Sequence, residues 1–200
     1  MAVRKTLKKL EGHIRPLDKW ELLERINKIK GRKQTRDKAL ASFLYLGGFR
    51  IEEVLTHYDD KTKTIKGQPI LKRQVELFDT SIIISTVRTL KRRKPIYRTI
   101  PIVRNELEKE FINLFLDHCN TLSEEEYLFK IKRSRAQQIF AKVYLFPHYF
   151  RHIRNTILAT KYNFTASELR HWNAWHSSIS GDAYVHLAYQ DLLNKMKRIN

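Results

Sequence analysis

The chain has 200 residues, 42% of them hydrophobic, and its 39 lysines and arginines against 21 acidic residues give a formal net charge of +18. Because this charge exceeds what solubility requires, the composition indicates a polyanionic partner, with nucleic acid favoured over a membrane surface. No apolar run reaches the ~18 residues of a membrane-spanning helix, the N-terminus lacks a signal peptide's apolar core, and a single cysteine, Cys119, excludes an internal disulfide and a cysteine-based zinc finger.

The first third of the chain predicts a basic arm followed by helices. Residues 1–15 have little apolar content, which is typical of an arm that becomes ordered on a polyanion or of a solvated tail. The cations of this arm that we expect to contact the partner are Arg4, Lys5, Lys8 and Lys9. Apolar residues at helical spacing predict a helix from about Asp18 and a second one over RDKALASFLYL, which stops at Gly47-Gly48. The segment GFRIEEVL predicts a further helix directly after these glycines.

The rest of the chain predicts a hairpin and more helices. Between about residues 61 and 103, the β-branched runs SIIISTVRTL and IYRTIPIV flank the basic KRRKP, which indicates a hairpin with a cationic tip. Leu107, Phe111, Leu114 and Phe115 then form one apolar helix stripe that packs in the core. Short helices are expected over SRAQQIFAKVYLF, PHYFRHIRNTILATKY, TASELRHWNAW and GDAYVHLAYQDLLNKM. The expected fold class is therefore α+β, mostly helical, with a small antiparallel β-sheet or hairpin.

Several chemistry-bearing residues follow one another in a specific order. Arg50 begins the helix after the glycines, His148 and Arg151 lie in PHYFRH, and Tyr184 follows Trp175 by nine residues. Each of these residues is weak evidence on its own, because a histidine or arginine on a helix is more often a surface group. Their common order and spacing are much more specific.

This order resembles the catalytic domain of the tyrosine recombinase (phage integrase) family, from about residue 16 to the end. The family carries a Gly-x-Arg-x-x-Glu box, a hairpin lysine, a Pro-His-x-Leu-Arg-His box, a His or Trp, and a tyrosine about nine residues later. The matching segments here are 48–53, the 91–94 turn, 147–152, Trp175 and Tyr184. The segment YVHL, at 184–187, resembles archaeal and archaeal-virus integrases.

The resemblance implies a strand-transfer reaction at one DNA phosphorus. A tyrosine hydroxyl, with an ordinary pKa near ~10, attacks phosphorus poorly at neutral pH and needs cations and a base beside it. Tyr184 is the expected nucleophile, and the product is a 3′-phosphotyrosyl bond with a free 5′ hydroxyl. Arg50 and Arg151 are expected to hold the non-bridging phosphate oxygens and to offset the charge of the transition state.

The remaining expected roles concern proton transfer and positioning. His148, one turn before Arg151, would move the tyrosine proton, and a hairpin lysine would protonate the departing 5′ oxygen. Lys91 is the first choice for that lysine and Lys94 the second. Trp175 would donate its indole N–H toward the phosphate; His176 is the alternative, and the nine-residue interval favours Trp175. Glu53 would orient an arginine or stabilise the helix.

These roles carry expectations about organisation and partners. We expect residues 1–15 to form the basic arm and 16–200 to form the catalytic domain, with no separate core-binding domain. The partner would be double-stranded DNA, contacted also by Arg92 and Arg93 of the hairpin tip, with no cofactor, metal or membrane. A homo-oligomer, a tetramer, is expected on DNA, and a monomer is compatible with the free state. The location would be cytoplasmic, on nucleoid or viral DNA.

Three alternatives remain open from the sequence. A type IB topoisomerase would use the same chemistry without joining two sites. A non-enzymatic DNA-binding protein would need only the charge and the helices. A metal-dependent nuclease is suggested only by Asp59, Asp60 and Lys61.

Overall fold

The computed structural model describes residues 17–55, 57–59, 64–66, 69–88, 97–174 and 189–197. The basic arm, the hairpin tip and the segment from 175 to 188 lie outside these residues. Within them, no helix has the length and apolarity needed to cross a membrane.

The helices of the first third begin and end at the residues that the sequence indicates. Helix α2 (Lys19–Asn27) starts at Asp18, whose carboxylate accepts the backbone N–H groups of Trp20 and Glu21, while the Glu21 carboxylate accepts the Asp18 N–H. Helix α3 (Gln34–Gly47) ends at Gly48, which has a left-handed φ of 61°. The short helix α4 (Ile51–Val54) follows at once. The helices predicted from Asp18 and on both sides of the glycine pair are thus confirmed.

The predicted hairpin forms the larger part of a small antiparallel sheet. Strand β4 (Ser81–Arg88) pairs with β5 (Tyr97–Val103), with Ile84 opposite Ile100, and β3 (Val75–Leu77) adds to the other edge of β4. The 3₁₀ turn η1 (Lys72–Gln74) precedes β3. Strands β1 (His57–Asp59) and β2 (Thr64–Lys66) form a separate ribbon. The antiparallel sheet expected from the β-branched runs is therefore confirmed, with β3 as an addition.

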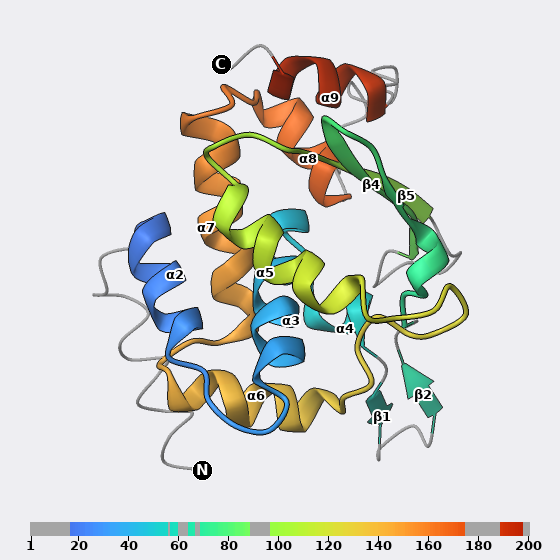
Figure 1. The fold of residues 1–200 in the computed structure, drawn as a ribbon. Helices are drawn as coiled ribbons and strands as arrows, with labels where there is room; N and C mark the ends of the chain where they lie inside the picture. Colours follow the sequence, from blue (N-terminus) through green and yellow to red (C-terminus); the bar gives the residue numbers. More distant parts are fainter. Residues whose placement is uncertain are drawn as a thin grey trace.

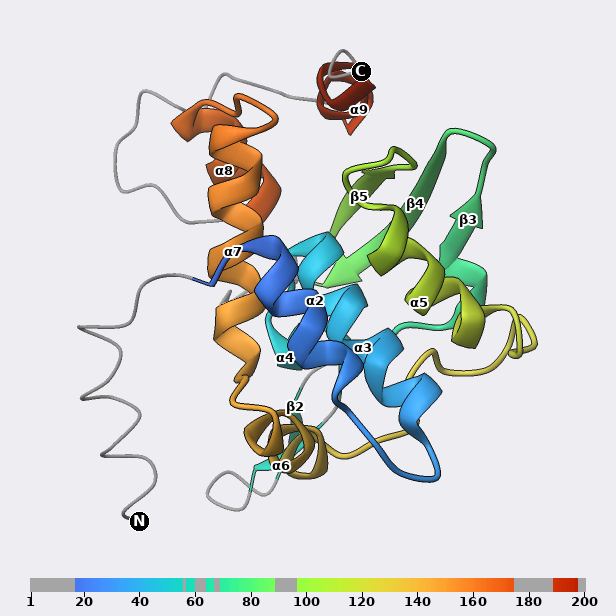
Figure 2. The ribbon, with the colours of Figure 1, turned by 60° about the vertical axis from the view of Figure 1, so that its left-hand side comes forward.

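Further helices follow the sheet along the chain. They are α5 (Lys109–Cys119), α6 (Arg133–Lys142), α7 (Pro147–Thr160), α8 (Ala166–Asn173) and α9 (Tyr189–Lys197). Helix α3 packs against both α5 and α7 (Figures 1 and 2). The mostly helical α+β class is thus the observed one.

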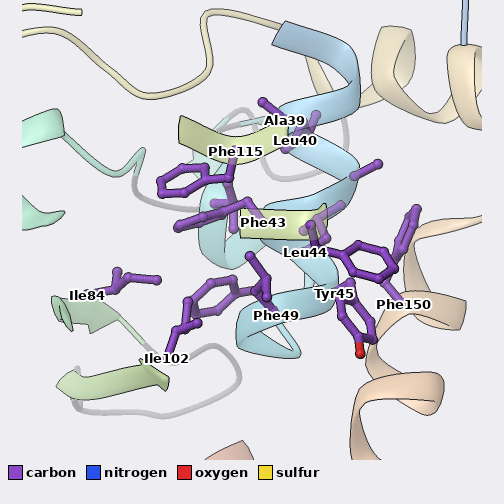
Figure 3. Close-up of a cluster of buried hydrophobic side chains, with 14 of the residues drawn as sticks. Ala39, Leu40, Phe43, Leu44, Tyr45, Phe49, Ile84, Ile102, Phe115 and Phe150 are labelled. Atoms are coloured by element: carbon purple, nitrogen blue, oxygen red, sulfur yellow. The ribbon is translucent and has the colours of Figure 1, made fainter. Parts of the chain in front are cut away.

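Aromatic side chains fill the centre of the core. Phe43 of α3 has its ring centroid 4.9 Å from that of Phe49, 5.0 Å from Phe115 and 5.5 Å from Phe129. Ile84 and Ile102 approach this cluster from the sheet (Figure 3). Full burial of Phe111 and Phe115 confirms the apolar stripe expected on α5.

The last turn of α5 holds the chain's single thiol. Cys119 is fully buried, and burial raises the pKa of this thiol to about 11. The side chain is therefore protonated at neutral pH and packs as a small apolar group, as the sequence indicates.

A fully buried ion pair joins α7 to the residue before α5. Arg154 donates to the Glu108 carboxylate at 2.5 Å, and the Tyr162 hydroxyl donates to the same oxygen at 3.1 Å. The guanidinium carbon lies 5.4–5.6 Å from the ring centroids of Tyr45, Tyr162 and Trp172. Burial by itself lowers the pKa of Arg154, but Glu108 and the tyrosines outweigh it and raise the pKa. The charge of Arg154 is thus held in place by a carboxylate and aromatic faces.

Helix α9 folds back onto its own domain. Met196 is fully buried, and the Lys195 ammonium lies 2.6 Å from the Glu168 carboxylate of α8 and 5.7 Å from the ring centroid of Phe164. The helix also packs against β5. The described part of the tail is therefore anchored within the same chain.

Candidate active site

Three of the predicted site residues line one cavity. Arg50, at the start of α4, meets His148 and Arg151 of α7 at a cavity of about 470 Å³. His148 and Arg151 are one helical turn apart and therefore share a face of α7. The fold thus joins side chains separated by about a hundred residues of sequence.

The glycine pair before Arg50 allows this approach. A Cβ atom on Gly47 would lie 2.0 Å from the ring of Phe49, and Gly48 has positive φ with the Trp172 indole nitrogen 3.3 Å from where its Cβ would be. The carbonyl of Gly47 accepts the Trp172 indole N–H at 3.1 Å, and that of Gly48 accepts Arg151 Nη1 at 2.9 Å. The glycines therefore connect Arg50 to α7 and α8 through their own backbone.

Arg151 is a buried cation at the wall of the cavity. Only 3% of its side chain is exposed, and Nη2 donates to the Asn173 carbonyl at 2.9 Å. Burial lowers the pKa of Arg151 to about 9; Glu53 acts in the opposite direction, while Arg50 and Arg98 lower the pKa further. The guanidinium therefore lies where an added negative charge would be stabilised.

Glu53 is the carboxylate around which the arginines gather. It is buried and accepts the Arg50 backbone N–H at 2.9 Å, Arg50 Nη1 at 3.0 Å and Arg98 Nη2 at 2.9 Å. Arg151 Nη1 lies 3.7 Å from the same carboxylate. We call Arg50, Glu53, Arg98 and Arg151 the arginine cluster; its four formal charges sum to an excess of positive charge.

Arg98 connects this cluster to the sheet and to α8. It lies on β5, donates to the backbone carbonyl of Trp172, and has its guanidinium carbon 5.7 Å from the ring centroid of Phe49. Burial lowers the pKa of Arg98, whereas Glu53 raises it. Arg98 therefore links β5 to α4 and α8.

Two histidines face each other on α7. The ring of His148 is exposed, and its centroid lies 4.6 Å from that of His152 at a perpendicular angle. His152 also lines the cavity, with Asn155 and Thr156 on the following turn. These groups can donate or accept protons and hydrogen bonds at the cavity.

The other expected site residues lie outside the described residues, and their roles stay predictions. They are Lys91, Lys94, Arg92, Arg93, Trp175, His176, Tyr184 and the arm cations Arg4, Lys5, Lys8 and Lys9. The same holds for Asp60 and Lys61 of the nuclease alternative. In the part of the chain that the structure describes, no three His, Cys, Asp or Glu side chains gather as metal ligands.

Sequence reasoning did not identify Arg98, Asn155 and Thr156 as neighbours of the site, and it placed His152 either behind the groups that contact the phosphate or on the surface. Three of them could have been found, because His152 is four residues after His148, and Asn155 is four residues after Arg151 with Thr156 next to it. Arg98 has no such signal, since it is 45 residues from Glu53.

The fold is similar to that of tyrosine recombinase catalytic domains. The XerH site-specific recombinase bound to difH substrate superposes with a TM-score of 0.53 over 89% of this chain, at 17% sequence identity. The Tn1549 transposon integrase in complex with circular intermediate DNA gives a TM-score of 0.51 over 91% of this chain, at 18% identity. The chain spans 52% and 64% of the lengths of those two chains. No protein-family model and no curated protein sequence matches this chain.

Proposed function

We propose that this protein is a DNA strand transferase of the tyrosine recombinase class, which breaks and rejoins strands during site-specific recombination. The observation that carries the proposal is the meeting of Arg50, His148 and Arg151 at one cavity, in the order of the recombinase motifs. The similarity of the fold to two recombinases in complex with DNA supports it. Residues 16–200 would form the catalytic domain, and residues 1–15 a basic arm on double-stranded DNA.

The arginine cluster supplies the physical reason for an anionic substrate. Three guanidinium groups surround one carboxylate, and burial, together with repulsion from Arg50 and Arg98, lowers the pKa of Arg151. A phosphodiester at the cavity would relieve this repulsion, and the additional charge of a pentacoordinate phosphorus would relieve it further. Stabilisation of the transition state above that of the ground state is what accelerates a reaction.

The proposed reaction is a balanced exchange of one phosphodiester for another. The Tyr184 oxygen bonds to phosphorus as the bond from phosphorus to the 5′ oxygen breaks. The tyrosine proton passes to His148, and Lys91 gives a proton to the departing 5′ oxygen. Because the phosphotyrosyl bond retains the free energy of the phosphodiester, attack by another 5′ hydroxyl restores a DNA strand without a nucleotide cofactor.

The decisive experiment uses a nicked suicide duplex, from which the 5′ fragment diffuses away after cleavage and leaves the covalent intermediate. We expect a DNA adduct that survives denaturation and maps to Tyr184 by peptide sequencing. Tyr184→Phe should abolish the adduct, whereas Tyr189→Phe, the matched control at the next tyrosine of the chain, should retain it. An adduct that persists in Tyr184→Phe contradicts the assignment of the nucleophile.

Two further readouts separate the alternatives. A metal-dependent nuclease would lose all strand cleavage in EDTA, whereas the proposed reaction continues. A type IB topoisomerase would relax supercoils without joining two DNA sites, so recombinant products in a two-site assay distinguish the recombinase. We propose a homo-oligomer, a tetramer, as the form that joins the two sites. Absence of an adduct on every DNA tested would favour a binding protein.

A further inference from the structure

A second cavity, of about 350 Å³, lies between the α2–α3 connection and α6. We call it the basic cavity. Its lining includes six cations from these two regions: Lys28, Lys30, Arg32, Lys33, Arg135 and Lys142. Such a concentration of one charge around a hollow raises the local electrostatic potential and favours an anion.

The acidic groups near the basic cavity offset only part of this charge. Asp37 lines the cavity, but it already accepts Arg36 Nη2 at 2.6 Å and Nε at 2.9 Å. Glu24 lies 2.5 Å from the ammonium of Lys28. Among the residues that the structure describes, Lys30, Arg32 and Lys33 have no ion-pair partner.

The shape of the connection lets a ligand come close to the backbone. Gly31 has a φ of +126°, and a Cβ built on it would have no atom within 4 Å. Opposite this open turn, Arg135 and Lys142 are seven residues apart on α6, two helical turns along one face. Cations therefore reach the basic cavity from two directions, a geometry that suits the oxygens of one phosphate group.

The two cavities are close enough to engage the same duplex. Val143 lines the basic cavity and His148 lines the candidate active site. The five residues from one to the other span at most about 18 Å even when fully extended, which corresponds to about five base pairs of DNA. We propose that the basic cavity binds a backbone phosphate of the duplex whose cleavage takes place at Arg50 and Arg151. This inference rests on the proposed function and names a second contact for its DNA substrate.

The salt dependence of DNA binding tests this contact. The variant is Lys30→Gln/Arg32→Gln/Lys33→Gln. The matched control, Arg73→Gln/Lys109→Gln/Lys130→Gln, removes three exposed cations that each pair with a glutamate. Binding of a labelled duplex is measured by fluorescence anisotropy between ~50 and ~200 mM salt.

Loss of one phosphate contact should make the slope of log affinity against log salt shallower by about 0.9 and weaken binding about fivefold near ~0.15 M salt. The charge-retaining variant Lys30→Arg/Arg32→Lys/Lys33→Arg should keep the parent slope. Thermal unfolding of each variant checks that the fold is retained. The proposal is overturned if the salt-dependence slope of the Lys30→Gln/Arg32→Gln/Lys33→Gln variant equals that of the control. It is also overturned if this variant loses affinity for duplex RNA but keeps the parent affinity for duplex DNA.

The suicide-substrate assay keeps this test separate from that of the proposed function. If the parent protein forms no adduct but the slope still changes, the catalytic proposal fails while the phosphate contact stands.

Discussion

Replacement of Glu53 by glutamine should destabilise the fold by about 3–5 kcal/mol, the usual cost of removing one partner from a buried ion pair. The Glu53 side chain is 0% exposed, that of Arg98 is 8% exposed, and the two lie 2.9 Å apart. The pair with Arg50, whose side chain is 23% exposed, adds less because solvent screens it. For a domain of this size, the loss corresponds to a fall in Tm of roughly 6–20 °C.

The assay is urea unfolding followed by circular dichroism, on the parent, Glu53→Gln, Arg98→Met and the double variant. The double variant removes both Glu53 and Arg98, so neither of these two charges is left buried without the other. Its loss of stability should therefore be smaller than the sum of the two single losses by about 1–3 kcal/mol. Strictly additive effects, or a change below ~0.5 kcal/mol in Glu53→Gln, would refute the view that this carboxylate neutralises buried arginines.

Three further predictions follow from other contacts of the site and the tail. Gly47→Ala should lower the free energy of unfolding by about 1–3 kcal/mol, because the new methyl overlaps the Phe49 ring; a denaturant midpoint equal to that of the parent would contradict this. Arg151→Lys should slow single-turnover cleavage of suicide DNA by roughly 10²–10³-fold, since an ammonium cannot reproduce the planar fork, whereas the surface control Arg73→Lys should not. Burial by itself raises the pKa of Glu168, but hydrogen bonds from Lys195 and Thr165 outweigh burial and lower the pKa. The ion pair between Glu168 and Lys195 therefore holds α9 above about pH 4.5, and it is lost as the pH falls further. Hydrogen exchange of residues 189–197, corrected for intrinsic rates, should therefore accelerate below about pH 4.5 in the parent. An equal acceleration in Glu168→Gln would show that carboxylates other than Glu168 control the opening of α9.

Local signals in the sequence were sufficient for most of the elements. Apolar residues at helical spacing predict the start of α2 near Asp18, and Gly47-Gly48 predicts the end of α3, because both signals depend on neighbouring residues only. The β-branched runs likewise predict the pairing of β4 with β5. Strand β3 was not predicted, since three residues carry too little periodicity.

Long-range electrostatic contacts could not be predicted in the same way. No local pattern in the sequence pairs Arg154 with Glu108, yet the fold buries both and joins them across 46 residues. The contact of Arg98 with Glu53 spans 45 residues. Motif order placed Arg50, His148 and Arg151 at one proposed site and indicated that Glu53 orients an arginine, but it contained no information that Arg98 and Arg151 also lie beside this carboxylate.

The buried thiol at the end of α5 gives the molecule an intrinsic reporter. Cys119 is the chain's single cysteine, it is inaccessible in the folded state, and its pKa of about 11 leaves little thiolate to react. Maleimide or disulfide reagents can therefore modify the chain only when the packing around the end of α5 opens. The rate of alkylation then measures how often this part of the molecule opens, with and without DNA, and no probe has to be engineered.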